Sequence, residues 1–318
     1  MRTKNKQVTD VFKPSALIIS DMHLRDTPPL CRAGEDWFAV MSQKINTVLD
    51  VAKSYNIPIL DGGDIFHKWK SSPNLTGWSI RTISGCDFYT VAGNHDLPAH
   101  NMEQYYHSSL SVLESAGSVK VLKNINEIID MGDFYLSGCG WGCETRDVLE
   151  YKNDNNKVLI LHAEVYNGNS QIWQDSDNSC DAKKLLTRYP GYKLIIVGHN
   201  HDAFTYCGDA GRIVLSPGSM FRTTIDQIDY KPKYYLWDAK TNEIREHYFI
   251  VDKIEKIVDN KQEVEAGNDC VTFDFIKYLK TDTEIDISFR RNVESYINKN
   301  NVDEKVKSLL YESLESEV

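Results

Sequence analysis

The 318-residue chain predicts an α/β fold, and two patterns along the sequence support this class. As far as Asp202, short apolar runs alternate with amphipathic stretches. Buried strands separated by helical segments form a largely parallel sheet with helices on its faces. Beyond Asp202 the helical period disappears and strand-like runs follow one another, which predicts a second, more antiparallel sheet packed on the first.

The first strand and helix are the most distinct of the predicted elements. Residues 16–20 form an apolar run short enough for a buried strand. In the stretch after it, apolar residues recur on one face of a helix, at Trp37, Met41, Ile45, Val48, Leu49 and Ala52. The later strands are predicted at residues 57–60, 88–92, 119–122, 134–137, 158–161, 194–197, 204–207, 212–215, 234–238 and 247–251. Together these elements predict one domain over residues 1–252.

The remaining residues, 253–318, have a different pattern. Residues 259–269 are polar and are typical of a linker. Apolar side chains then recur at helical spacing on both sides of residues 298–301, which predicts a helix-loop-helix. We therefore expect a small C-terminal helical appendage.

Charge and hydropathy restrict the function classes. A formal net charge of -10 argues against loose, sequence-independent adhesion to nucleic acid, which depends on counterion release by many Lys and Arg contacts. No stretch approaches 18 uninterrupted apolar residues, and residues 1–13 are too polar for a signal peptide. We therefore expect a cytoplasmic protein that has no membrane partner. The seven cysteines contain no CxxC pair, so we expect reduced thiols.

Residues with metal-ligand side chains follow five of the predicted strands. They are Asp21, His23, Asp64, Asn94, His162, His199 and His201. The carboxyl ends of parallel strands meet at one edge of a sheet, where ligands bind in open α/β folds. Five loops that each supply one or two ligands are what a pair of divalent cations needs, with Asp64 as the natural bridge.

Each of these residues alone has an ordinary structural explanation. A lone His162 is more often hydrogen-bonded than metal-bound, and Gly93-Asn94 is a common turn dipeptide. The ordered occurrence of all five loops is much less expected by chance, so the joint pattern predicts a binuclear site. Carboxylate, amide and imidazole donors favour manganese, with iron, zinc or magnesium as alternatives.

The order of these motifs resembles that of the calcineurin-like metallophosphoesterases. The resemblance covers about residues 16–251, through the series DxH, GD, GNHD, H and GHxH. It implies a four-layer fold, in which two packed mixed β-sheets are flanked by helices, and a hydrolase that uses two metal ions. It also implies that Asp21, His23, Asp64 and His201 hold one metal, and that Asp64, Asn94, His162 and His199 hold the other.

His95 lies next to a predicted ligand but is assigned to neither metal. This makes it the candidate acid that protonates the leaving oxygen or stabilises the transition state. Asp96 follows directly, and carboxylates often orient an imidazole. A turn or cap hydrogen bond is the alternative role for Asp96.

Residues 62–67, Gly-Gly-Asp-Ile-Phe-His, narrow the subclass. They are similar to the second motif of the SbcD-like nucleases of DNA double-strand-break repair. In that family the histidine that matches His67 helps to place the DNA backbone for exonucleolytic cleavage. An ordinary surface or core histidine is the alternative reading of His67.

Four further residues are candidates for substrate contacts. Lys68, Trp69 and Lys70 follow His67 directly, and two cations around an aromatic ring could hold a phosphate backbone and stack a base. A solvated loop with Trp69 packed into the core is the alternative. Arg222, in a late Ser-Pro-Gly-Ser element, could neutralise a phosphate.

The resemblance also suggests partners. In SbcD-like nucleases a C-terminal helical element docks on the coiled-coil base of an SbcC-type ATPase, so residues 253–318 are a candidate docking element. Packing on their own domain is the alternative. By resemblance alone, a homodimer is also expected. The chain is shorter than typical members of the family, which fits a reduced, phage-type version.

Three function classes follow from these observations. The first is a manganese-dependent DNA exonuclease or endonuclease of SbcD type. The second is a phosphoesterase that acts on a cyclic nucleotide, a dinucleotide or a phosphoprotein, which would explain the acidic chain. The third is a non-catalytic scaffold, which predicts missing ligands, whereas none of the seven is missing.

Overall fold

A computed structural model describes residues 11–32, 35–142, 156–168, 180–250 and Lys307. The chain divides into two compact units, Met1–Ile257 and Val258–Val318. Apart from Lys307, every described residue belongs to the first unit. The predicted helix-loop-helix therefore lies outside the described residues, and the appendage over 253–318 stays a prediction.

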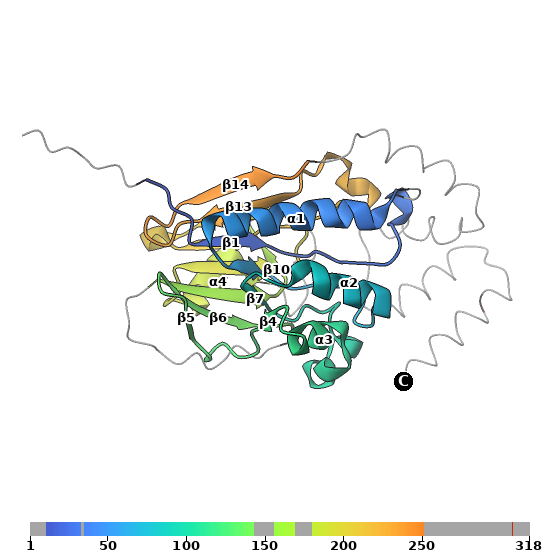
Figure 1. The fold of residues 1–318 in the computed structure, drawn as a ribbon. Helices are drawn as coiled ribbons and strands as arrows, with labels where there is room; N and C mark the ends of the chain where they lie inside the picture. The colour runs from blue at the N-terminus through green and yellow to red at the C-terminus, as the bar shows by residue number, and fades with distance from the viewer. Residues whose placement is uncertain (1–10, 33–34, 143–155, 169–179, 251–306, 308–318) are drawn as a thin grey trace, which may run out of the picture. The chain divides into compact units, whose positions relative to one another are not determined.

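Two six-stranded mixed sheets form the centre of the first unit (Figure 1). The first sheet contains, in spatial order, β14 (Ile244–Tyr248), β13 (Lys233–Trp237), β1 (Ala16–Ile19), β2 (Ile59–Asp61), β3 (Phe88–Thr90) and β4 (Lys120–Val121). The second contains β11 (Phe204–Cys207), β12 (Ile213–Ser216), β10 (Leu194–Gly198), β7 (Lys157–His162), β6 (Tyr135–Cys139) and β5 (Ile129–Asp130). A separate two-stranded sheet pairs β8 (Val165–Tyr166) with β9 (Cys180–Asp181).

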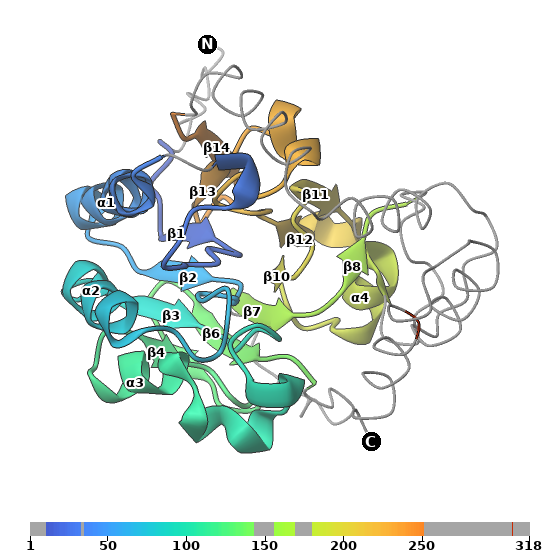
Figure 2. The ribbon, with the colours of Figure 1, turned by 90° about the vertical axis from the view of Figure 1, so that its right-hand side faces the viewer.

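Helices cover the outer face of each sheet, as Figure 2 shows. The first sheet packs against α1 (Trp37–Tyr55), α2 (Pro73–Ile83) and α3 (Ser109–Ser115), and the second against α4 (Ala182–Arg188). Short 3-10 helices lie at Leu30–Arg32, Pro98–His100, Met102–His107, Asp209–Gly211 and Ile225–Asp229. None of the described helices has both the length and the apolar character needed to cross a bilayer.

The strands of both sheets bury side chains on both faces. In β1, Leu17 and Ile19 face the helices, whereas Ala16 and Ile18 face the second sheet. Strand β10 alternates in the same way between the first sheet and α4. Burial on both faces requires apolar residues at successive positions, which explains the continuous apolar runs. The predicted four-layer α/β fold is confirmed.

The prediction that the late strands form a sheet of their own is wrong. Strand β13 pairs antiparallel with β1, and β12 pairs parallel with β10. Each sheet therefore combines early and late strands. An apolar run identifies a strand, but its hydrogen-bonding partner depends on the path of the whole chain.

Cysteine chemistry also differs from the prediction at one position. Cys139, at the end of β6, is disulfide-bonded. Among the described residues, Cys31, Cys86, Cys180 and Cys207 are free. The expectation of reduced thiols is therefore wrong for Cys139.

Candidate metal centre

The ends of five parallel strands bring the predicted ligands together. In the first sheet, Asp21 follows β1, Asp64 follows β2 and Asn94 follows β3. In the second sheet, His162 is the last residue of β7 and His199 comes directly after β10. The centre therefore lies where the carboxyl ends of strands from both sheets meet.

Asp21, His23 and His201 form one group of ligand atoms. The Nε2 atoms of His23 and His201 are 2.9 Å apart, and they lie 3.9 Å and 4.0 Å from Oδ1 of Asp21. Imidazole nitrogens that face one another need a proton or a cation between them. The side chain of His201 is 40% exposed, so this group is open to solvent.

Asp64, His162 and His199 form a second group. Nε2 of His162 lies 3.4 Å from Oδ2 of Asp64 and 3.1 Å from Oδ1 of Asn94. Nδ1 of His199 is 3.0 Å from the same Asn94 oxygen. Oδ2 of Asp64 is also 3.7 Å from Nε2 of His23, so its carboxylate lies between the two groups, where a bridging ligand would be.

The protonation of the buried ligands fits the binding of cations. Burial raises the pKa of Asp21, although His162 and His201 oppose this shift. Burial also keeps the pKa of His23 well below its usual range, so its ring stays neutral. Metal ligands must be ionised carboxylates or neutral imidazoles, and a bound cation would offset the cost of burying the Asp21 charge.

Asp64 and His162 behave as a buried ion pair in the protein alone. Burial opposes both charges, but the attraction between the two side chains outweighs it. The pKa of Asp64 is lowered, and that of His162 is raised to about 9. A cation would take the place of the proton on His162.

Four predicted ligands have left-handed backbone conformations, namely Asp21 (φ 51°), His23 (φ 44°), Asp64 (φ 55°) and His199 (φ 92°). Such conformations cost roughly 1–3 kcal/mol each in residues other than glycine, and they concentrate at functional sites. Gly93 allows a close approach, because a Cβ there would lie 1.9 Å from Oδ1 of Asp64. The left-handed conformations and the close approach at Gly93 therefore allow these loops to bring the ligand side chains together.

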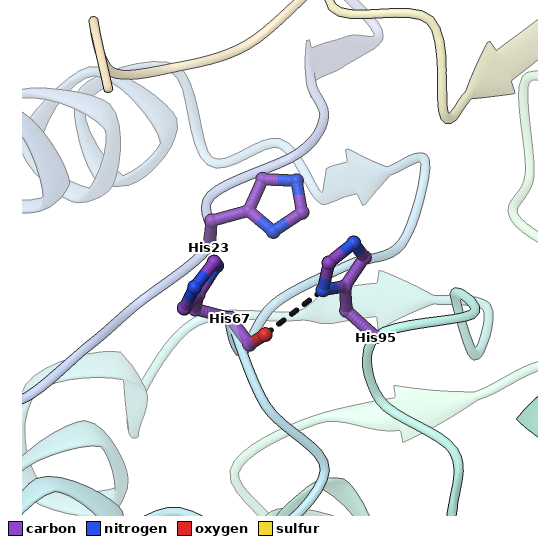
Figure 3. A group of neighbouring side chains, drawn as sticks. All are labelled: His23, His67 and His95. Atoms are coloured by element: carbon purple, nitrogen blue, oxygen red, sulfur yellow. Dashed lines mark hydrogen bonds between the residues drawn. The ribbon is translucent and has the colours of Figure 1, made fainter. Parts of the chain in front are cut away.

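His95 is oriented by backbone rather than by Asp96. Its amide donates to Oδ1 of Asp64 at 2.9 Å, and its Nδ1 lies 2.9 Å from the carbonyl oxygen of His67 (Figure 3). A carbonyl only accepts, so Nδ1 carries the proton and Nε2 is left for another partner.

Asp96 connects two loops of the centre instead. Its carboxylate is fully buried and accepts from the amides of Phe66 (2.9 Å), Gly93 (3.0 Å) and Ile65 (3.3 Å). The predicted contact with the His95 ring is therefore replaced by the alternative, backbone hydrogen bonds within the turn. Burial raises the pKa of Asp96 to about 7, and Asp64 adds to this shift.

Figure 3 shows His23, His67 and His95 around one gap. Their ring centroids are 5.9 Å (His23–His67), 4.8 Å (His23–His95) and 5.6 Å (His67–His95) apart. Nδ1 of His23 is buried and has no hydrogen-bond partner among the described residues. Beside these rings, the described part of the chain therefore leaves one buried imidazole nitrogen without the hydrogen bond that buried polar atoms normally make.

The predicted substrate contacts divide into two sets. Lys68 and Lys70 are exposed and line a pocket with His67, whereas Trp69 between them is only half-buried. Arg222 is 2% exposed and donates to the carbonyl of Ile228 at 2.9 Å. The guanidinium of Arg222 is therefore used inside the fold, and a contact with phosphate stays a prediction.

Sequence reasoning missed one residue of this region, Arg25. It lines the same pocket as Lys68 and Lys70. Its position two residues after His23 was the available signal, since that loop already supplied two predicted ligands.

The chain belongs to the calcineurin-like phosphoesterase family, whose profile matches residues 15–203. This range contains all seven predicted ligands, from Asp21 to His201. Members of the family are metal-dependent phosphoester hydrolases, and the Asp and His groups described above could hold the divalent metals.

Comparison with solved structures adds only distant similarity. One crystal structure is 14% identical, with a TM-score of 0.43, and the match covers 74% of this chain and 100% of the other. The hypothetical protein PH1004 from Pyrococcus horikoshii OT3 is 12% identical, with a TM-score of 0.41 and coverage of 81% and 96%. No curated protein sequence matches the chain. Family membership therefore rests on the profile and the arrangement of the ligands.

Proposed function

We propose that this phosphoester hydrolase is a manganese-dependent DNA nuclease of SbcD type. The main support is His67, which comes from the Gly-Gly-Asp-Ile-Phe-His string and lies beside both His23 and His95. The exposed Lys68 and Lys70 follow on the same segment, with Trp69 between them. A phosphate backbone that leaves the metal centre on this side meets these cations.

The mechanism combines two metals with side chains of the chain itself. Divalent cations, when bound, supply Lewis-acid activation of water and of the phosphoryl oxygens. His95 donates through Nδ1 to the carbonyl of His67, and when its ring carries a second proton, on Nε2, it can give that proton to the leaving oxygen and become neutral. Asp96 holds the loops after β2 and β3 together, which supports the hydrogen bond from the His95 amide to Asp64.

A second candidate is a phosphoesterase for a cyclic nucleotide, a dinucleotide or a phosphoprotein. It is favoured by the net charge of -10, which opposes general attraction to DNA. It uses the same metal groups, so only the substrate distinguishes it from the nuclease.

An assay with added manganese would separate the two candidates. The substrates are end-labelled linear DNA, bis-4-nitrophenyl phosphate, a cyclic nucleotide and a phosphopeptide, with a chelator as the control. We expect cleavage of DNA and of the generic diester. Rapid turnover of the cyclic nucleotide or the phosphopeptide, with DNA left intact, would overturn the nuclease proposal.

The proposal includes a partner for residues 253–318, namely a coiled-coil ATPase of SbcC type. Its support is the helical spacing of apolar residues in that part of the sequence. A chain truncated after Val251 should bind metal but no longer retain the ATPase. Retention by the truncated chain would contradict this role.

A further inference from the structure

A small pocket adjoins the metal centre at His67. It has a volume of about 120 Å³, and its walls come from the loop after β1 and from the segment that leads into α2. The two segments are joined by backbone hydrogen bonds from Leu24 to Ile65 (2.8 Å) and from His67 to Leu24 (3.0 Å). The pocket is therefore built on the same backbone that positions His23 and Asp64.

The pocket is cationic although the chain is acidic. Arg25, Lys68 and Lys70 line it with one carboxylate, that of Asp26, so its formal charge is +3 - 1 = +2. The Asp26 carboxylate accepts from the backbone amide of Ser72 at 3.4 Å and from its hydroxyl. No hydrogen bond or ion pair joins any of the three cationic side chains to another described residue.

Arg25 is the unusual member of this set. Its side chain is only partly exposed, and its Nε is shielded from solvent without any hydrogen-bond partner. A buried donor that lacks an acceptor is unfavourable, and more so when it is charged. A guanidinium whose Nε is shielded and lacks an acceptor can bind an anion from outside the chain.

The start of α2 adds to the positive potential. This 11-residue helix begins at Pro73 with Ser72 as its N-cap, and both Ser71 and Leu75 line the pocket. The N-terminal end of a helix carries a partial positive charge that favours phosphate groups. The helix end and the three cationic side chains therefore favour the same kind of ligand.

We infer that the pocket lined by Arg25, Lys68 and Lys70 binds a second phosphate of the substrate, adjacent to the phosphate that is hydrolysed. The inference rests on the proposed phosphodiesterase function and specifies its substrate class. His67 joins the two places, because it lines the pocket and its ring lies 5.9 Å from that of His23. The preferred substrate is therefore an oligonucleotide or another ester with two neighbouring phosphates, rather than an isolated diester.

Equilibrium binding to the full-length chain tests the pocket directly. By calorimetry with manganese present, thymidine 3′,5′-bisphosphate should bind about tenfold more tightly than thymidine 5′-monophosphate, since a hydrogen bond to a charged group contributes on that scale. Arg25→Gln should remove most of this difference. Arg81→Gln, an exposed substitution within α2, is the matched control and should keep the difference.

A second experiment measures KM and kcat for the hydrolysis of thymidine nitrophenyl phosphodiesters, with and without a second phosphate. The second phosphate should lower KM about tenfold in the parent chain, and Arg25→Gln should raise that KM with little change in kcat. If Arg25→Gln does not fold, Lys70→Gln at the exposed rim should shift KM in the same direction by a smaller factor.

The outcomes separate this inference from the proposed function. Suppose that the chain hydrolyses diesters but binds both nucleotides equally, or that Arg25→Gln keeps the preference for the bisphosphate. Either result would contradict phosphate binding in the pocket and leave the proposed phosphodiesterase function standing. Absence of any diester hydrolysis would overturn the phosphodiesterase, whereas the calorimetric comparison would still decide whether the pocket binds phosphate.

Discussion

The metal centre and the pocket beside it are built on the same loops but have opposite electrostatic character. In the centre, the buried carboxylates of Asp21 and Asp64 face imidazole nitrogens at 3.4–4.0 Å. In the pocket, the guanidinium of Arg25 has no partner among the described residues. The first environment favours cations and the adjoining one favours anions, which is the combination that the proposed substrate with two neighbouring phosphates would need.

The two regions also differ in how tightly the fold constrains them. The centre has four ligands in left-handed backbone conformations and a glycine, Gly93, that a methyl group would force against Asp64. The pocket is edged by the exposed side chains of Lys68 and Lys70. Substitutions in the centre should therefore have larger effects than substitutions in the pocket.

Asp64→Asn should have the largest effect, because this carboxylate lies between both groups of ligands. We expect loss of bound metal and a fall in diester hydrolysis of more than about 100-fold, above the range found for residues that only support ligands. Metal analysis and a bis-4-nitrophenyl phosphate assay measure both. Asp26→Asn, in the pocket, is the control and should keep its metal. Normal metal content in Asp64→Asn would contradict the position of this carboxylate between the two groups.

His95→Ala should strongly reduce hydrolysis but leave the metals in place. General acid catalysis contributes about 10²–10⁴-fold, so kcat should fall by that factor for every substrate. Metal analysis of the purified variant gives the second measurement. His107→Ala, an exposed histidine in a 3-10 helix, should behave like the parent chain. Loss of metal from His95→Ala would show that this residue is a ligand.

His67→Ala should separate the two regions, since His67 lies between them. The carbonyl that orients His95 belongs to the backbone of residue 67, so it survives the substitution. We expect digestion of duplex ends to fall about tenfold further than hydrolysis of a small diester, on the scale of one lost charged or polar contact. Equal losses on both substrates would remove the reason for assigning the SbcD subclass.

The smallest effect should be on the pH dependence of stability. Burial, with Arg25, His95 and Lys68 adding repulsion, lowers the pKa of His67 to about 4 from an ordinary 6.5. As the pH falls, His67 is protonated in the unfolded chain before it is protonated in the folded chain. The contribution of neutral His67 to the free energy of unfolding is therefore fully present above pH 6.5 and is lost as the pH falls towards 4.

Arg25→Gln should make this loss shallower, because it removes one repelling charge from His67. Urea denaturation of the metal-free chain at pH 7 and pH 5 measures the difference, with Arg81→Gln as the control. Identical pH dependence in the Arg25 and Arg81 variants would show that Arg25 does not act on His67.

Helices and strands whose formation depends on residues close in the sequence were predicted well from local patterns. The apolar face of α1, from Trp37 to Ala52, is buried as its spacing predicted. The pairing of β13 with β1 was not predictable in this way, because more than 200 residues separate Leu17 from Leu236 in the sequence. The apolar runs show which segments form strands, but many pairings would bury them equally well.

The sequence by itself determined the family and its reaction class, because Asp21, Asp64, His162 and His199 stand at the ends of successive apolar runs and form one ordered motif series. Only the tertiary structure decided how the other polar residues are used. Asp96 accepts from backbone amides of its own loop and of the loop after β2, and Arg222 donates to the carbonyl of Ile228, whereas Arg25 Nε has no hydrogen-bond partner among the described residues. The physical reason is that a side chain's partners depend on which distant segments fold against it, and buried polar groups take the nearest available partner.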